Sequence, residues 1–118
     1  MQRDPRAYLS DILEAAAAIQ DATRTIGEAG YSQSRLIRSA VEREFIIIGE
    51  ALKGIAQRDP QLFAVIPEGR QIIDFRNLLT HEYLNVSDQV VWGAIQTDLP
   101  VLIEHCTQLL NQFEEEKS

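Results

Sequence analysis

Residues 34–55, SRLIRSAVEREFIIIGEALKGI, decide the fold of this chain. Apolar side chains recur there every three or four residues, at Ile37, Val41, Phe45, Ile48, Leu52 and Ile55. This spacing places them on one face of an α-helix, which Ser32 or Ser34 can cap. Ile46 and Ile47 lie partly off that face, so the helix is apolar on more than one side. The stretch predicts a long helix that packs against a second helix layer or a partner chain.

A first helix is expected before this stretch. Asp4 is a suitable N-cap and Pro5 a suitable first helical residue. Apolar side chains follow at helical spacing, at Tyr8, Ile12, Ala15, Ile19 and Ile26. We expect Gly27 and Gly30 to end this helix.

Two further helical segments are expected after it. Asp59-Pro60 repeats the signal of a cap followed by proline and predicts a short helical turn through about Phe63. Pro67 ends that connection, and a helix over residues 68–80 or 68–81 follows. The polar run that carries the candidate site lies at the end of this helix.

The last helix is expected to begin after Ser87, its N-cap. It carries nine apolar side chains at Val90, Val91, Ile95, Leu99, Leu102, Ile103, Leu109, Leu110 and Phe113. Pro100 removes one backbone donor and clashes with the carbonyl of residue 96, so we expect a kink, or two separate helices. Together the segments predict an all-α, up-and-down bundle of four main helices.

Composition limits the class of protein. The 118 residues are enough for one domain over residues 1–118, and no apolar run approaches the length of a membrane span. The start lacks an apolar signal-peptide segment, and the single Cys106 cannot form an intramolecular disulfide, so we expect a cytoplasmic protein. A net charge of −7 argues against a general nucleic-acid binder but leaves room for a local basic cleft.

Residues 76–83, RNLLTHEY, gather an unusual set of polar side chains. On a helical wheel the apolar residues face the bundle, and Arg76, Asn77, Thr80 and His81 share the opposite side. Ile73 is an apolar residue on this polar side, and we expect it either to be a harmless exception to the pattern or to contact another chain. An arginine beside a histidine suggests phosphate chemistry, because one side chain holds the anion while the other moves a proton.

Ordinary structural roles remain open for the same residues. Arg76 can form an ion pair with Asp74, Glu82 or another acid. His81 can interact with the last carbonyls of its helix, and Tyr83 can be a half-buried side chain with a hydrated hydroxyl. Spacing alone does not decide between these roles and catalysis.

The run resembles the R-x4-H-x-Y motif of HepT-like toxins in the HEPN superfamily, through Arg76, His81 and Tyr83. Other segments are similar to the same family in the same order, namely Arg43 with Ile48-Gly49-Glu50-Ala51, and Val91-Trp92 followed by Asp98-Leu99-Pro100. The resemblance covers nearly the whole chain, and the chain does not depart from the family within the motif.

This resemblance implies a four- or five-helix HEPN bundle that forms a homodimer, with the two motifs meeting in a cleft at the interface. It also implies a metal-independent endoribonuclease toxin that acts on RNA. Carried onto this chain, Arg76 and His81 are the catalytic pair. Asn77 belongs to the catalytic set as their support, and Thr80 is a further supporting residue.

The resemblance further implies a partner, a minimal nucleotidyltransferase antitoxin of the MntA type in a type VII-like toxin–antitoxin pair. That partner transfers AMP to the motif tyrosine, here Tyr83, and so silences the nuclease. We expect no metal ion and no other cofactor, and the chain has no glycine-rich phosphate loop. No membrane association is expected.

A second interpretation has a different class of function. In it the chain is a non-catalytic helical subunit that binds nucleotides or substrate for a two-component nucleotidyltransferase, and the acidic net charge favours it slightly. Two other residues are expected to be structural. Cys106 is expected to be buried and inert, and Trp92 to pack in the core or at an interface.

Overall fold

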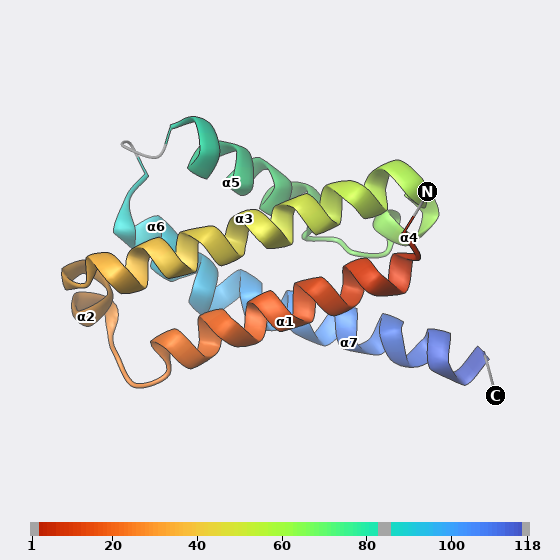
Figure 1. Ribbon diagram of the computed structural model, residues 1–118, viewed down its shortest axis with the longest axis horizontal. Coiled ribbons are helices and arrows are strands. Elements are labelled where there is room, and N and C mark those ends of the chain that lie inside the picture. The colour runs from red at the N-terminus through yellow and green to blue at the C-terminus, as the bar shows by residue number, and fades with distance from the viewer. Residues whose placement is uncertain (1–2, 83–85, 117–118) are drawn as a thin grey trace.

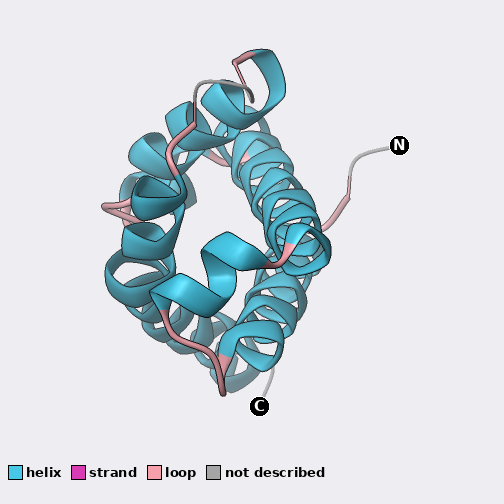
Figure 2. Ribbon diagram, turned by 90° about the vertical axis from the view of Figure 1, so that its left-hand side faces the viewer, coloured by secondary structure: helices cyan, strands magenta, loops and turns pink. Residues whose placement is uncertain are grey.

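Two long helices, α1 (Pro5–Thr23) and α3 (Arg35–Arg58), run side by side in opposite directions through the computed structural model (Figure 1). The structure describes residues 3–82 and 86–116. Helix α5 (Gly69–His81) packs along α3, and α7 (Leu99–Glu116) packs along α1. The four directions alternate, and the view along the bundle shows the helices around its long axis (Figure 2). The predicted all-α, up-and-down bundle of four main helices is confirmed over the described residues.

The caps are those that the sequence indicates. Asp4 accepts a hydrogen bond from the Arg6 backbone N–H at 2.9 Å. Ser34, rather than Ser32, accepts from the Ile37 N–H at 3.2 Å. These short polar side chains satisfy N–H groups that have no partner inside the helix, which fixes where each helix begins.

A short helix, α2 (Glu28–Gln33), lies between α1 and α3 and was not expected. Helix α1 ends at Thr23, before Ile26 and before the two glycines that were expected to end it. Gly27 occupies the N-cap position of α2, and Gly30 lies inside α2. Tyr31 is fully buried from this helix. Burial of that large ring outweighs the weak helix propensity of one glycine.

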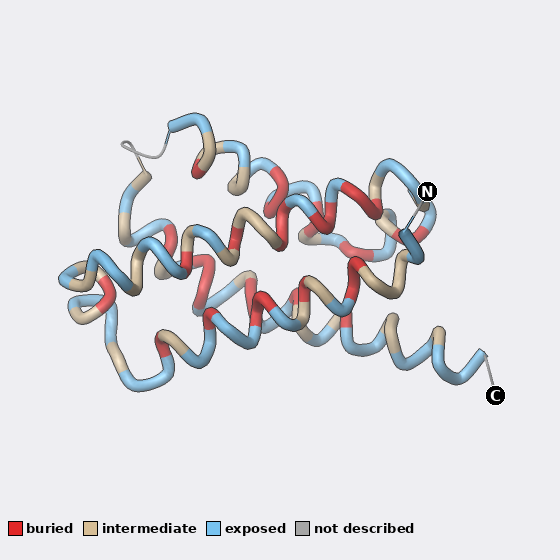
Figure 3. Tube along the Cα trace, viewed as in Figure 1, coloured by how far each residue is buried: buried red, intermediate tan, exposed pale blue. Residues whose placement is uncertain are grey.

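The core runs between the long helices, where the buried residues of α1 and α3 face one another (Figure 3). The predicted apolar face of α3 is buried at Val41, Phe45, Ile48, Leu52 and Ile55. Ile46 and Ile47 are partly buried against it. The expectation that α3 packs on more than one side is therefore confirmed.

Helix α5 is reached through the short helix α4 (Pro60–Ala64), which Asp59 caps by accepting from the Leu62 N–H at 3.0 Å. Helix α5 ends at His81, and the Glu82 N–H closes the last turn on the Leu78 carbonyl at 2.8 Å. Tyr83 lies outside the described residues. The structure therefore places the predicted Arg76, Asn77, Thr80 and His81, but not Tyr83.

Pro100 is accommodated by a π-helical turn. Helix α6 (Asp88–Gly93) continues into η2 (Ala94–Asp98), which continues into α7 with helical dihedral angles. The Leu99 N–H bonds to the Ala94 carbonyl, five residues back. The wider turn sits just before the proline, where an ordinary helix would suffer the ring clash. The expected disturbance near Pro100 is thus a π turn rather than a gap between two helices.

Cys106 is fully buried on α7, as expected. Burial raises the pKa of its thiol to about 12, and the nearby Glu68 carboxylate adds to that shift. A thiol in that state is a poor nucleophile at neutral pH. Within the described residues, none of the helices combines the length and the apolar character that a membrane crossing requires.

Candidate active site

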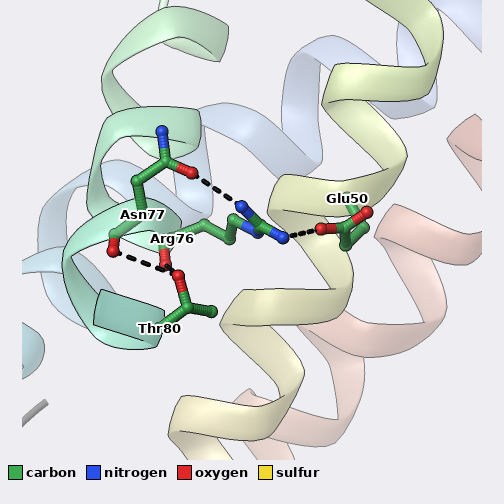
Figure 4. A network of polar contacts seen from close by, with 4 residues as sticks. All are labelled: Glu50, Arg76, Asn77 and Thr80. Carbon is green, nitrogen blue, oxygen red and sulfur yellow. Dashed lines mark hydrogen bonds and ion pairs between the residues drawn. The ribbon is translucent and has the colours of Figure 1, made fainter. Parts of the chain in front are cut away.

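Arg76 points from α5 toward α3 rather than away from the bundle (Figure 4). Its side chain is only 18% exposed, and Ile72, Ile73 and Leu79 are buried around it on the same helix. The prediction that Arg76 lies on the solvent side is wrong. Ile73 is buried inside this chain, so it is neither a harmless apolar residue on a polar side nor a contact with another chain. The wheel assigned Arg76 to solvent from its charge, whereas its position is in the middle of the buried face.

A glycine on α3 makes this inward position possible. A Cβ atom at Gly49 would overlap the Cβ and Cγ atoms of Arg76, so the arginine stem lies directly against the α3 backbone. A glycine inside a helix costs about 1 kcal/mol relative to alanine. The close approach of the two helices at this point explains why a glycine is accommodated there.

The guanidinium group is held by two oxygen atoms. Its Nη2 donates to Oε1 of Glu50 on α3 in an ion pair, and its Nη1 donates to Oδ1 of Asn77 at 2.7 Å (Figure 4). Nε is buried and has no hydrogen-bond partner among the described residues. The head group is therefore fixed between two helices, with the Glu50 side chain 52% exposed at its outer edge.

Thr80 supports the same turn of α5. Its hydroxyl contacts the Arg76 and Asn77 carbonyl oxygens, each at 3.1 Å, and donates its hydrogen to them. This back-bonding keeps the hydroxyl on the helix instead of directing it outward. The structure thus brings Arg76, Asn77 and Thr80 into one network, together with Glu50.

His81 is exposed at the last residue of α5. It lies five positions after Arg76, which corresponds to about 140° around the helix and about 7.5 Å along it. No hydrogen bond within residues 3–82 and 86–116 joins His81 to Asn77, although their spacing allows one. The histidine and the arginine of one chain therefore point to different sides of the same helix end.

Glu50 is the partner of Arg76 that the residue patterns alone did not select. Asp74 and Glu82, the two acids named as possible partners of Arg76, are exposed and do not pair with it. Of the ion pairs that the sequence left open, the structure contains the one with another acid. The only sequence signal for Glu50 was its place in the Gly49-Glu50 pair of the family-like run. The spacing of residues along one helix cannot indicate a contact between two residues that are 26 positions apart in the sequence.

The other histidine has a structural position. Nδ1 of His105 on α7 lies 2.9 and 3.0 Å from the two carboxylate oxygens of Glu68, just before α5. The Glu68 side chain is only 9% exposed. This contact between the two side chains fastens the beginning of α5 to α7. In the part of the chain that the structure describes, no three His, Cys, Asp or Glu residues are grouped so that they could hold a metal ion.

A hollow of about 520 Å³ lies elsewhere, between α1 and the α6–α7 segment. Gln20, Trp92, Gln96 and Pro100 are among its lining residues, and none of the four motif residues that the structure places is among them. Trp92 also packs against Tyr31, with ring centroids 5.8 Å apart, so its expected packing role is confirmed.

Comparison with known proteins gives a consistent result. The sequence model of the family described as "Ribonuclease HepT-like" matches residues 12–109. A "Probable ribonuclease HepT" of Thermococcus cleftensis is 35% identical over 86% of this chain and 92% of its own length. A "Putative RNase" of Methanocaldococcus jannaschii is 32% identical over 84% of this chain and 90% of its own length.

A longer relative has a second activity in its name. The "Gamma-glutamylcyclotransferase and putative RNase" of Methanocaldococcus jannaschii is 27% identical over all of this chain, which spans 53% of that protein. No solved structure matches the chain.

Proposed function

We propose that this chain, which belongs to the HepT-like ribonuclease family, cleaves RNA with Arg76 and His81 and without a metal ion. Family membership gives the activity class, an endoribonuclease. One observation carries the assignment of residues. An arginine head group fixed by Glu50 and Asn77 lies on the same helix that ends at an exposed histidine.

The chemistry requires three groups. A base takes the proton of the 2′-hydroxyl, an acid protonates the leaving 5′-oxygen, and positive charge stabilises the phosphorane between these steps. The imidazole of His81 can carry protons at physiological pH, and the guanidinium of Arg76 can hold the phosphate through two N–H groups. Asn77 keeps that guanidinium in place.

A second copy of the chain completes the proposed site. One motif supplies one histidine, whereas the reaction uses both a base and an acid. Arg76 and His81 of one chain also diverge around their helix, so a phosphate is better enclosed between two motifs. Leu36 of α3 is 82% exposed, and Ile46, four residues before Glu50, is only partly buried. These apolar side chains support a homodimer formed through this side of α3.

Tyr83 is the proposed point of control. It follows His81 by two residues, so an AMP group on its hydroxyl would lie near the end of α5. The added phosphodiester would bring negative charge that attracts Arg76 and repels the RNA phosphate. The enzyme that adds it is a minimal nucleotidyltransferase antitoxin, and the chain is the toxin of that cytoplasmic pair.

A second candidate function is a non-catalytic subunit that binds nucleotides or substrate for a nucleotidyltransferase. The observation that favours it is charge. The chain has a net charge of −7, and Arg76 already has a carboxylate partner. In this alternative the motif holds a phosphate but does not move protons.

One experiment separates the two functions. The chain is expressed without any partner as wild type, Arg76→Ala and His81→Ala, and growth and total RNA are followed. The control is Arg70→Ala, which removes an exposed arginine of the same helix whose guanidinium lies over the Phe63 ring. We expect growth arrest and RNA loss with wild type and Arg70→Ala only. Equal behaviour of all four proteins would support the binding subunit instead.

A further inference from the structure

We infer that Glu50 is a positioning residue of this site, which holds the Arg76 guanidinium in the orientation that receives an RNA phosphate. The inference rests on the proposed function of Arg76. It adds a residue from a different helix, to which neither the motif nor the comparisons assign a role. Glu50 acts through Arg76 and does not itself touch the reacting atoms.

The donors of the guanidinium support this role. An arginine head group carries five N–H groups in a fixed plane. Glu50 takes one from Nη2, Asn77 takes one from Nη1, and the Nε–H is buried. One N–H therefore remains on each terminal nitrogen. Two N–H groups are the number that a bidentate contact with phosphate uses.

Neither Gly49 nor Asn77 can fix this orientation alone. Gly49 lies against the arginine stem but has no side chain that could bond to the guanidinium nitrogen atoms. Asn77 offers a neutral acceptor on the same helix, whereas the Glu50 carboxylate carries the charge opposite to that of the guanidinium and adds a Coulombic attraction to its hydrogen bond. The Glu50 bond also joins two helices, so it resists rotation of the head group about the arginine torsions.

Two observations argue against the opposite effect, in which Glu50 competes with RNA for Arg76. The Glu50 side chain is 52% exposed, so solvent screens its repulsion of an approaching phosphate more than its direct bond to Nη2. Its carboxylate occupies one donor of Nη2 and leaves the other available. A preorganised guanidinium also avoids reorganisation when charge develops on the phosphorane.

Steady-state cleavage of a short RNA tests the inference with Glu50→Ala, Glu50→Gln and the control Glu44→Gln. Glu44 lies on the same helix, is partly buried and lines the groove toward α1 instead of contacting Arg76. A displacement of ~1 Å at a catalytic group can reduce the rate about 10²-fold. We expect kcat to fall about 10- to 10²-fold in Glu50→Ala and less in Glu50→Gln, which keeps an acceptor oxygen. Glu44→Gln should remain at the wild-type kcat.

A double-mutant cycle shows whether the effect passes through Arg76. Binding of an uncleavable 2′-O-methyl RNA is measured for Glu50→Gln, with and without Arg76→Ala. Glu50→Gln should weaken binding when Arg76 is present and have no effect when it is absent. Thermal melting identifies any variant that fails to fold. If Glu50→Ala does not fold, Glu50→Gln, which conserves the shape of the side chain, serves for both the cleavage test and the binding test.

Faster cleavage by Glu50→Gln, unchanged cleavage by both variants, or the same loss of binding in both Arg76 backgrounds would each overturn the inference. Failure of the proposed function has a different signature. In that case Arg76→Ala would cleave RNA as the wild type does, or the wild type would not cleave it. Loss of cleavage in Arg76→Ala together with wild-type cleavage in Glu50→Ala removes only the role of Glu50.

Discussion

The side chain of Arg76 on α5 lies directly against the Gly49 backbone of α3. This contact sets the separation of the two helices at the point where the guanidinium meets Glu50 and Asn77 (Figure 4). A residue with a Cβ atom would fill the space of the arginine stem. The packing of the bundle and the position of the proposed phosphate-binding group therefore depend on the same glycine.

Gly49→Ala is predicted to lower both stability and cleavage. The added methyl group overlaps atoms close to the α5 backbone, so the helices must separate, at a cost of about 1–3 kcal/mol. Urea denaturation measures that cost, and RNA cleavage of the folded fraction measures the displacement of Arg76. The control is Gly93→Ala, because a Cβ at Gly93 meets nothing within 4 Å. The free energy of unfolding of Gly93→Ala should rise by up to about 1 kcal/mol because alanine has the higher helix propensity. Equal stability of the two variants would contradict the contact between Gly49 and Arg76.

Tyr31→Phe is predicted to stabilise the chain. The Tyr31 hydroxyl is buried without a hydrogen-bond partner among the described residues. Burial raises its pKa, and Glu42 and Asp88 raise it further. Removing the hydroxyl relieves a penalty of about 1 kcal/mol, equivalent to a Tm increase of roughly 4 °C. Differential scanning calorimetry tests this, and a lower Tm would show that the hydroxyl has a stabilising contact.

Asp98→Asn is predicted to change how stability depends on pH. Burial raises the pKa of Asp98, and the nearby Glu68 carboxylate raises it further. The folded state therefore binds a proton more readily than the unfolded state, and stability falls as pH rises through the raised pKa. An asparagine cannot ionise, so the variant should be more stable than the wild type at pH 7.

Urea midpoints between pH 3 and pH 7 measure this change. The exposed Asp74→Asn, on α5, controls for the loss of one negative charge. The Asp98→Asn advantage should shrink toward acidic pH, where the wild-type carboxyl is protonated. An advantage that grows as the pH falls would have the wrong sign.

Tyr83→Phe is predicted to separate control from catalysis. Phenylalanine lacks the hydroxyl that we propose as the AMP acceptor, so the variant should escape modification by the proposed nucleotidyltransferase and remain toxic in its presence. Intact-mass spectrometry after incubation with the partner and ATP gives the measurement, with the wild type as positive control. An AMP adduct on Tyr83→Phe would refute the assignment of this tyrosine.

The parts of the fold set by local interactions could be predicted from sequence. Asp4, Asp59 and Ser87 begin their helices as expected, because a cap is an interaction between residues two or three positions apart. Helix α2 was missed because the burial of Tyr31 depends on contacts with distant segments. The π turn before Pro100 was expected only as a disturbance, since several helical distortions can accommodate a proline.

The candidate site was predictable in composition but not in orientation. The exposed positions of Asn77 and His81 follow from the wheel, whereas the inward position of Arg76 does not. A helical wheel contains information about one helix only. Arg76 points inward because the neighbouring helix α3 provides space at Gly49 and a hydrogen-bond acceptor at Glu50. Such a pairing between helices requires the tertiary structure.

Cleavage of a defined RNA in EDTA, compared with the same oligonucleotide carrying one 2′-deoxy nucleotide at the cut site, tests the central claim most directly. A mechanism that uses the 2′-hydroxyl, with Arg76 and His81 as its groups, predicts cutting of the RNA with a 2′,3′-cyclic phosphate end. It predicts no cutting of the 2′-deoxy substrate, and none by His81→Ala. Equal cutting of both substrates by the wild type, or undiminished cutting by His81→Ala, would contradict the account.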